Sequence, residues 1–83
     1  MKKKSKLFLV TGGTGFIGSN ICKLLLKQGH KVLIYDNNFR GSLKKLSSIR
    51  NQVTFIKGDI RNKKKIFICC SKVDAVIHLA YIN

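Results

Sequence analysis

Hydrophobic and polar residues alternate along this chain in blocks that predict strands and helices in turn. Four short apolar runs are each followed by glycine or polar residues, and continuous apolar runs of this length are typical of strands buried on both faces of a parallel sheet. The segments between them repeat apolar residues three or four positions apart, which is the spacing of an amphipathic helix. The expected strands are residues 7–10, 32–35, 53–56 and 75–80.

Three helices are expected between these strands. The first covers residues 15–28, and Gly29 is its stop signal. Ser42 can cap a second, short helix, and Asn62 can cap a third. The apolar residues of these helices at helical spacing are Ile17, Ile21, Leu24 and Leu25 in the first, Leu43, Leu46 and Ile49 in the second, and Ile66, Cys69, Cys70 and Val73 in the third.

This alternation predicts an α/β fold of the doubly wound, Rossmann type. Parallel neighbours need crossover connections, and these connections are right-handed almost without exception. The expected strand order is 3-2-1-4 in a β-α-β-α-β-α-β chain, over residues 6–83 after a basic tail at 1–5. The fourth strand would then be an open apolar edge, which intact domains cover, so we expect the sequence to be the first part of a longer, incomplete fold.

A glycine-rich turn is the most informative segment for function. Gly13, Gly15 and Gly18 satisfy G-x-G-x-x-G directly after a buried strand and at the start of a helix, and Thr11 and Gly12 precede them. Glycines allow the tight turn and let the backbone approach a pyrophosphate. No charged residue occurs from residue 7 to 22, so backbone N–H groups and the helix dipole must bind the anion. This pattern predicts dinucleotide binding rather than a P-loop, which needs a lysine after the last glycine.

Asp36 follows the second strand, about 20 residues after the glycine turn. Its carboxylate can accept hydrogen bonds from an adenosine ribose and would repel a 2′-phosphate, so NAD is expected rather than NADP. Arg40 can partly offset that repulsion. Asp59 comes just after the third strand, where it can accept from the adenine amino group, or pair with one of the many lysines instead.

The composition is strongly basic, with 17 Lys and Arg against three Asp, no Glu and a net charge of +14. A site made of clustered carboxylates, for a metal ion or for paired acid/base catalysis, is therefore not expected. The lysines are spread over the tail, helices and loops, without an aromatic stacking surface. We therefore interpret them as a solvated surface, with a basic nucleic-acid-binding domain as the alternative.

Targeting signals and cysteine spacing add little to the functional prediction. The apolar run behind the basic start is too short for a signal peptide, and no run approaches the roughly 18 residues of a membrane span, so a cytoplasmic protein is expected. Cys22, Cys69 and Cys70 show neither C-x-x-C nor histidine-partnered spacing. We expect small buried or half-buried side chains rather than disulfides or zinc ligands.

Four motifs together resemble the amino-terminal part of a known family. They are residues 11–18, Asp36-Asn37, Gly58-Asp59-Ile60 and His78-Leu79-Ala80, in the order found in the NAD-dependent epimerase/dehydratase family, the extended short-chain dehydrogenase/reductases. The resemblance implies an NAD cofactor and a nucleotide-sugar substrate. A homodimer would be implied only for a full-length form.

The resemblance also implies roles along the chain. Phe16 and Ile17 would lie against the pyrophosphate, and Asp36, Asn37, Asn38 and Arg40 would surround the adenosine ribose. Asp59 and Ile60 would meet the adenine, and Leu79, Ala80 and Tyr81 would line the dinucleotide cleft. The expected cofactor-binding residues are Gly12, Gly13, Gly15, Phe16, Ile17, Gly18, Asp36, Asn37, Asn38, Arg40, Asp59, Ile60, Leu79, Ala80 and Tyr81. Tyr81 departs from the small residue often found there.

Catalytic residues of that family are not expected here. Its members use a Tyr-x-x-x-Lys pair with a Ser or Thr, but Tyr35 is followed four positions on by Phe39, and the sequence ends two residues after Tyr81. His78 is interpreted as a packed strand-end histidine rather than a catalytic base. The chain is thus expected to be a cofactor-binding portion, inactive alone, with a stand-alone NAD-binding or interaction module as the alternative.

Overall fold

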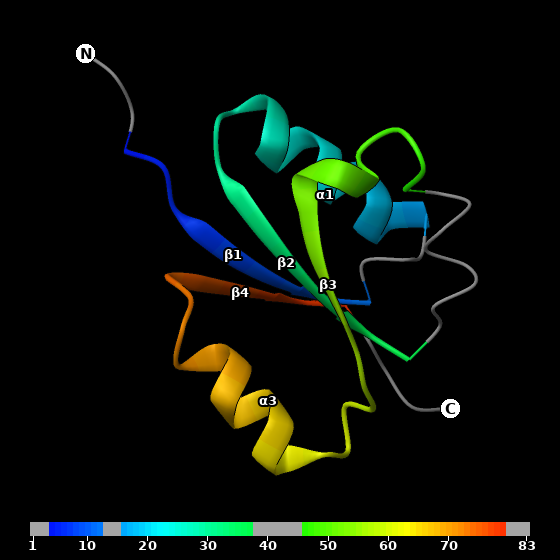
Figure 1. Cartoon of the computed structure of the whole chain (residues 1–83), viewed down its shortest axis with the longest axis vertical. Helices are drawn as coiled ribbons and strands as arrows, with labels where there is room; N and C mark the ends of the chain where they lie inside the picture. Colours follow the sequence, from blue (N-terminus) through cyan, green and yellow to red (C-terminus); the bar gives the residue numbers. More distant parts are fainter. Residues whose placement is uncertain (1–3, 13–15, 38–45, 80–83) are drawn as a thin grey trace.

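The computed structural model describes residues 4–12, 16–37 and 46–79, and within these ranges the chain forms one parallel sheet with helices on both faces (Figure 1). The strand order β3-β2-β1-β4 confirms the expected 3-2-1-4 order, and every neighbouring pair is parallel. The strands are β1 (Leu7–Thr11), β2 (Lys31–Asp36), β3 (Val53–Lys57) and β4 (Ala75–His78).

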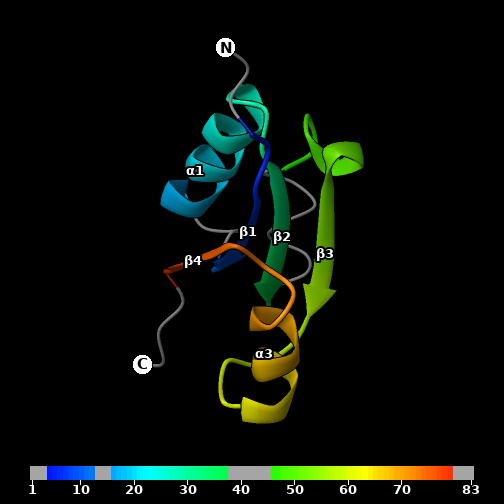
Figure 2. The same cartoon turned by 90° about the vertical axis from the view of Figure 1, so that its left-hand side faces the viewer.

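Two helices connect the strands. Helix α1 (Phe16–Lys27) joins β1 to β2, and α3 (Lys63–Cys70) joins β3 to β4. They cover opposite faces of the sheet, as two views at right angles show (Figures 1 and 2). The Asn62 side chain accepts a hydrogen bond from the Lys65 amide, which confirms the expected helix cap.

Part of the expected second helix lies outside the described residues, including Ser42 and Leu43. Its described part is a turn over residues 46–49 followed by the 3₁₀ helix η1 (Arg50–Gln52). Leu46 and Ile49 are nevertheless buried, so they contribute to the core as expected. The third strand extends to Lys57, and α3 ends before Val73, which packs against the core from the turn that follows.

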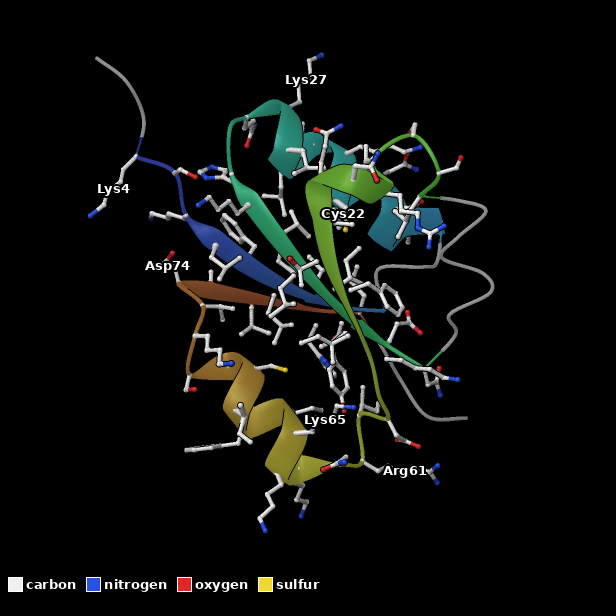
Figure 3. All side chains as sticks on the ribbon, in the orientation of Figure 1. Lys4, Cys22, Lys27, Arg61, Lys65 and Asp74 are labelled. Carbon is white, nitrogen blue, oxygen red and sulfur yellow. The ribbon has the colours of Figure 1, made fainter. Side chains whose placement is uncertain are left out.

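The core has two parts, one on each face of the sheet, because side chains alternate along a strand. The α1 side buries Val10, Cys22, Leu25, Val32, Ile34, Leu46 and Ile49. Burial raises the pKa of the Cys22 thiol to about 11, so it stays protonated and packs as a small apolar group (Figure 3). The three cysteines are free and buried or half-buried, as expected.

Helix α1 turns a different side to the sheet than the apolar spacing predicts. Cys22 and Leu25 are buried and Ile21 is half-buried, but Ile17 is 65% exposed and Leu24 is 53% exposed. Small residues explain the difference, since Gly18 and Ser19 are buried and bring the helix close to its neighbours. The apolar stripe of α1 is therefore wider than the surface that the described residues cover.

The α3 side of the core contains Leu9, Leu33, Tyr35 and Cys69. Tyr35 has no exposed surface, and its hydroxyl donates a hydrogen bond to the Asp59 carbonyl oxygen at 2.7 Å. Gly58 lies against the same ring, and a Cβ atom added there would lie 2.5 Å from Cζ of Tyr35. The chain can follow this path only with glycine at position 58.

Candidate functional site

The carboxyl ends of the parallel strands meet at one edge of the sheet, and the candidate residues lie just beyond them. The segments that leave β1, β3 and β4 are each held by a neighbouring strand. The Gly12 amide donates to the Tyr35 carbonyl at 3.2 Å, the Gly58 amide to the Asp36 carbonyl at 3.0 Å, and the Leu79 amide to the Thr11 carbonyl at 3.0 Å. These three bonds place the starts of three loops side by side, at the edge where doubly wound sheets bind ligands.

The glycine turn begins as the motif requires. Gly12 has a φ of 74°, a conformation that glycine adopts without a steric penalty. Gly13 and Gly15 lie outside the described residues, as does the side chain of Phe16. Helix α1 starts at Phe16 with no acidic residue in its first turn, and the positive end of its dipole at this N-terminus favours an anion.

Asp36 is the last residue of β2 and is only 7% exposed. Its carbonyl oxygen holds Gly58, so its position is tied to the start of the third loop. Asn37 is exposed beside it, while Asn38 and Arg40 lie outside the described residues. Asp36 therefore lies one strand away from Thr11, the residue that precedes the glycine turn.

Asp59 forms an ion pair that the sequence reading did not assign. Its two carboxylate oxygens accept from Nε and Nη2 of Arg61, at 2.6 to 3.1 Å, and Oδ1 also accepts from the Arg61 amide. The partner is thus an arginine two residues away rather than a lysine. Hydrogen bonds from the guanidinium, then from the Arg61 amide, lower the pKa of the Asp59 carboxyl to about 2. Ile60 is half-buried against the α3 side of the core.

This ion pair predicts a specific titration. The Asp59 carboxyl resonance in a ¹³C NMR experiment should titrate with a midpoint near pH 2, and Arg61→Gln should return that midpoint to about 4, the ordinary value for aspartate. Because the pKa is lowered in the folded chain, any stabilisation from the pair is present above about pH 4 and lost as the pH falls toward 2. An unchanged midpoint in Arg61→Gln would contradict the assignment.

Tyr35 is a residue that sequence reasoning missed. Burial raises the pKa of its hydroxyl, and the nearby Cys69 and Asp59 add to the rise, so the group remains a neutral donor to the Asp59 carbonyl. This hydrogen bond holds the Asp59 backbone in position. The available signal was a tyrosine within an apolar strand, because a buried phenol needs a hydrogen-bond partner.

Thr11 and His78 form a second contact that the sequence reading missed. Oγ1 of Thr11 lies 2.6 Å from Nδ1 of His78 and also accepts from the Leu79 amide at 3.1 Å. Thr11 is 2% exposed, but His78 is exposed. The expectation of a packed histidine is therefore wrong in its burial, because β4 has no neighbour on its outer side within the described residues; its place at the end of a strand is confirmed. Ala80 and Tyr81 lie outside the described residues.

Residues 4–12, 16–37 and 46–79 contain no group of three or more His, Cys, Asp or Glu residues that could hold a metal ion. None of the helices in these ranges is long and apolar enough to cross a membrane. The charged side chains of Lys4, Lys27 and Arg61 extend from different sides of the molecule (Figure 3).

A parallel sheet of this order, with a glycine turn leading into a helix and an aspartate at the end of the next strand, defines a Rossmann-type nucleotide-binding fold. Comparison with protein families places it more closely. Residues 8–83 match the NAD dependent epimerase/dehydratase family, and the chain belongs to that family.

Related proteins include UDP-glucose 4-epimerase from Neisseria meningitidis serogroup B, which is 46% identical over 82 residues, or 90% of this chain and 24% of the relative. UDP-N-acetyl-alpha-D-glucosaminuronate decarboxylase from Bacillus cytotoxicus is 38% identical, over 99% of this chain and 25% of the relative. This chain therefore spans about a quarter of the length of these relatives.

Solved structures agree with the fold. The Bordetella bronchiseptica enzyme WbmG in complex with NAD superposes with a TM-score of 0.83 at 27% identity, over 99% of this chain and 27% of that one. UDP-glucose 4-epimerase from Stenotrophomonas maltophila, with bound NAD and formylated UDP-arabinopyranose, superposes with a TM-score of 0.81 at 32% identity, over 94% and 25% respectively.

Proposed function

We propose that this chain forms the part of a nucleotide-sugar-modifying oxidoreductase that binds the adenosine and pyrophosphate of NAD. The observation that carries the proposal is the set of three backbone hydrogen bonds that hold the starts of the Gly12, Gly58 and Leu79 loops at one edge of the sheet. In this arrangement the Gly12 turn and the N-terminus of α1 can bind a pyrophosphate without a charged side chain. The family match and the NAD complexes among structural neighbours support the same cofactor.

The proposed roles are divided among the residues that follow the strands. Asp36 would accept hydrogen bonds from the adenosine ribose, and the repulsion between its carboxylate and a 2′-phosphate favours NAD over NADP. Asp59, whose carboxylate pairs with Arg61 and whose carbonyl oxygen accepts from Tyr35, would face the adenine with Ile60. The remaining predicted residues, Gly13, Gly15, Phe16, Ile17, Gly18, Asn37, Asn38, Arg40, Leu79, Ala80 and Tyr81, would complete the site.

Bound NAD would supply the hydride acceptor of the family's chemistry, and the residues of this chain would bind and orient it. These 83 residues contain no Tyr-x-x-x-Lys pair, so we assign them no proton-transfer step. Relatives named as a UDP-glucose 4-epimerase, a decarboxylase and a CDP-paratose 2-epimerase all match the same segment. A segment shared by enzymes with such different reactions carries out their common step, which is cofactor binding.

Calorimetric titration of NAD into the purified chain tests the proposal. Asp36→Asn should weaken NAD binding about tenfold or more, because hydrogen bonds to a charged group contribute about 1.5–3 kcal/mol. It should also reduce the preference for NAD over NADP. Asp74→Asn is the matched control, since Asp74 lies at the opposite edge of the sheet, at the start of β4, where it accepts from the Leu7 amide. Equal binding by the two variants, or no NAD binding by a folded chain, would refute the proposal.

A further inference from the structure

Arg61 directly contacts a residue of the proposed cofactor site without being part of that site itself. Its side chain extends away from the sheet beyond the end of β3 (Figure 3), and it is 72% exposed, while the Asp59 side chain is 37% exposed. An exposed ion pair adds little to stability, so the effect of this one falls mainly on the orientation of the Asp59 carboxylate.

The Asp59 carboxylate is held by three donor groups of this one arginine. Oδ1 accepts from the Arg61 amide at 2.8 Å and from Nε at 3.0 Å, and Oδ2 accepts from Nη2 at 2.6 Å. Nε also lies 3.1 Å from Oδ2, so the guanidinium binds both oxygens. Because a carboxylate offers about four acceptor positions, one position remains, and it is on Oδ2.

The backbone of Asp59 is held as well as its side chain. Its carbonyl oxygen accepts from the Tyr35 hydroxyl at 2.7 Å and from the Asn62 amide at 3.0 Å. The amide of the preceding residue, Gly58, donates to the Asp36 carbonyl at 3.0 Å. The remaining acceptor position on Oδ2 is therefore set before a ligand binds, which lowers the conformational entropy that binding costs.

This acceptor stays ionised at neutral pH. Hydrogen bonds from the guanidinium and the Arg61 amide lower the pKa of the Asp59 carboxyl to about 2, so the group can accept a hydrogen bond but not donate one. An amino group can donate to it, whereas a carbonyl oxygen in the same place would be repelled. Among purines, adenine carries an amino group at carbon 6, and hypoxanthine carries an oxygen there.

We propose that Arg61 is a positioning residue for base recognition, which holds the Asp59 carboxylate so that the cofactor site selects a 6-aminopurine over a 6-oxopurine. The inference rests on the proposed function, in which Asp59 contacts the base, and Arg61 acts through Asp59. With Arg61 in place, the carboxylate cannot turn away from a 6-oxo group, so the wrong base meets a negative charge. Without Arg61 the carboxylate rotates, which weakens the bond to adenine and relieves the repulsion of hypoxanthine.

Calorimetric titrations with two dinucleotides, NAD and nicotinamide hypoxanthine dinucleotide, measure this selectivity. The original chain should bind NAD about tenfold more tightly or better, because the amino group donates to a charged acceptor. Arg61→Gln should reduce the ratio of the two affinities about fivefold. Arg61→Lys keeps the charge but lacks the forked guanidinium, so it should lose most of the selectivity as well. Arg61 is largely exposed, so neither substitution leaves a cavity in the core.

Arg50→Gln is the matched control, because Arg50 precedes β3 at the opposite end of that strand and its loss changes the net charge equally. This variant should keep the affinity ratio of the original chain. A ratio near one in the original chain, an unchanged or increased ratio in Arg61→Gln, full selectivity in Arg61→Lys, or an equal loss in Arg50→Gln would each overturn the inference. The two proposals are separable: NAD binding with an unchanged ratio refutes only the role of Arg61, and a folded chain that binds neither dinucleotide refutes the proposed function itself.

Discussion

Gly58→Ala is expected to destabilise the chain by about 3 kcal/mol, a large fraction of the stability of a domain of this size. The added Cβ would overlap the end of the Tyr35 ring, which is fully buried and hydrogen-bonded to the Asp59 carbonyl, so the ring cannot move aside. Urea denaturation followed by circular dichroism measures the loss. Because Gly58 leads directly into Asp59, any folded remainder should also bind NAD less tightly.

A double-mutant cycle separates this overlap from other effects. Tyr35→Leu removes the atoms that the new Cβ would meet, so Gly58→Ala should cost much less in that background than in the original chain. Gly29→Ala is the control for backbone conformation: Gly29 has a φ of 88° and nothing within 4 Å of an added Cβ. Its cost should be about 1–2 kcal/mol, from the left-handed conformation alone. Additive effects of Gly58→Ala and Tyr35→Leu would show that the Tyr35 ring is not the cause.

Thr11→Val is expected to destabilise the chain by about 1–2 kcal/mol although the side chain keeps its shape. The buried hydroxyl links the ends of β1 and β4, by accepting from the Leu79 amide and contacting the His78 ring. Its removal should raise hydrogen exchange at Leu79 and broaden or shift the His78 ring signals in NMR spectra. Since Thr11 precedes the Gly12 turn, NAD affinity should fall as well.

Thr11→Ser keeps the hydroxyl and loses only a methyl group, so it should retain the His78 and Leu79 signals of the original chain. If Thr11→Val and Thr11→Ser change exchange at Leu79 equally, the methyl group rather than the hydroxyl holds the two strands together.

The sequence predicts the order of elements well because each rests on local chemistry. Buried strands show as apolar runs, Gly12 marks a turn with positive φ, and Asn62 caps α3 through its own side chain. The Asp59–Arg61 pair is also local, but the excess of lysines obscured it. The exposure of Ile17 and Leu24 was not predictable in this way, since a helical repeat does not say how much of its apolar stripe another element covers.

The sequence by itself determined the α/β class, the parallel strand order and the placement of the glycine turn and Asp36 after successive strands, because periodicity and strand-end chemistry are properties of short segments. Tertiary structure alone decided which residues position the site. Tyr35 meets Gly58 and Asp59, more than 20 residues away, and Thr11 meets His78 and Leu79, more than 65 residues away, only because parallel pairing brings the strand ends to one edge. The tertiary structure also decided that apolar side chains are exposed on the β4 side of the sheet. Burial depends on which elements pack together, and the order of residues along the chain does not show that.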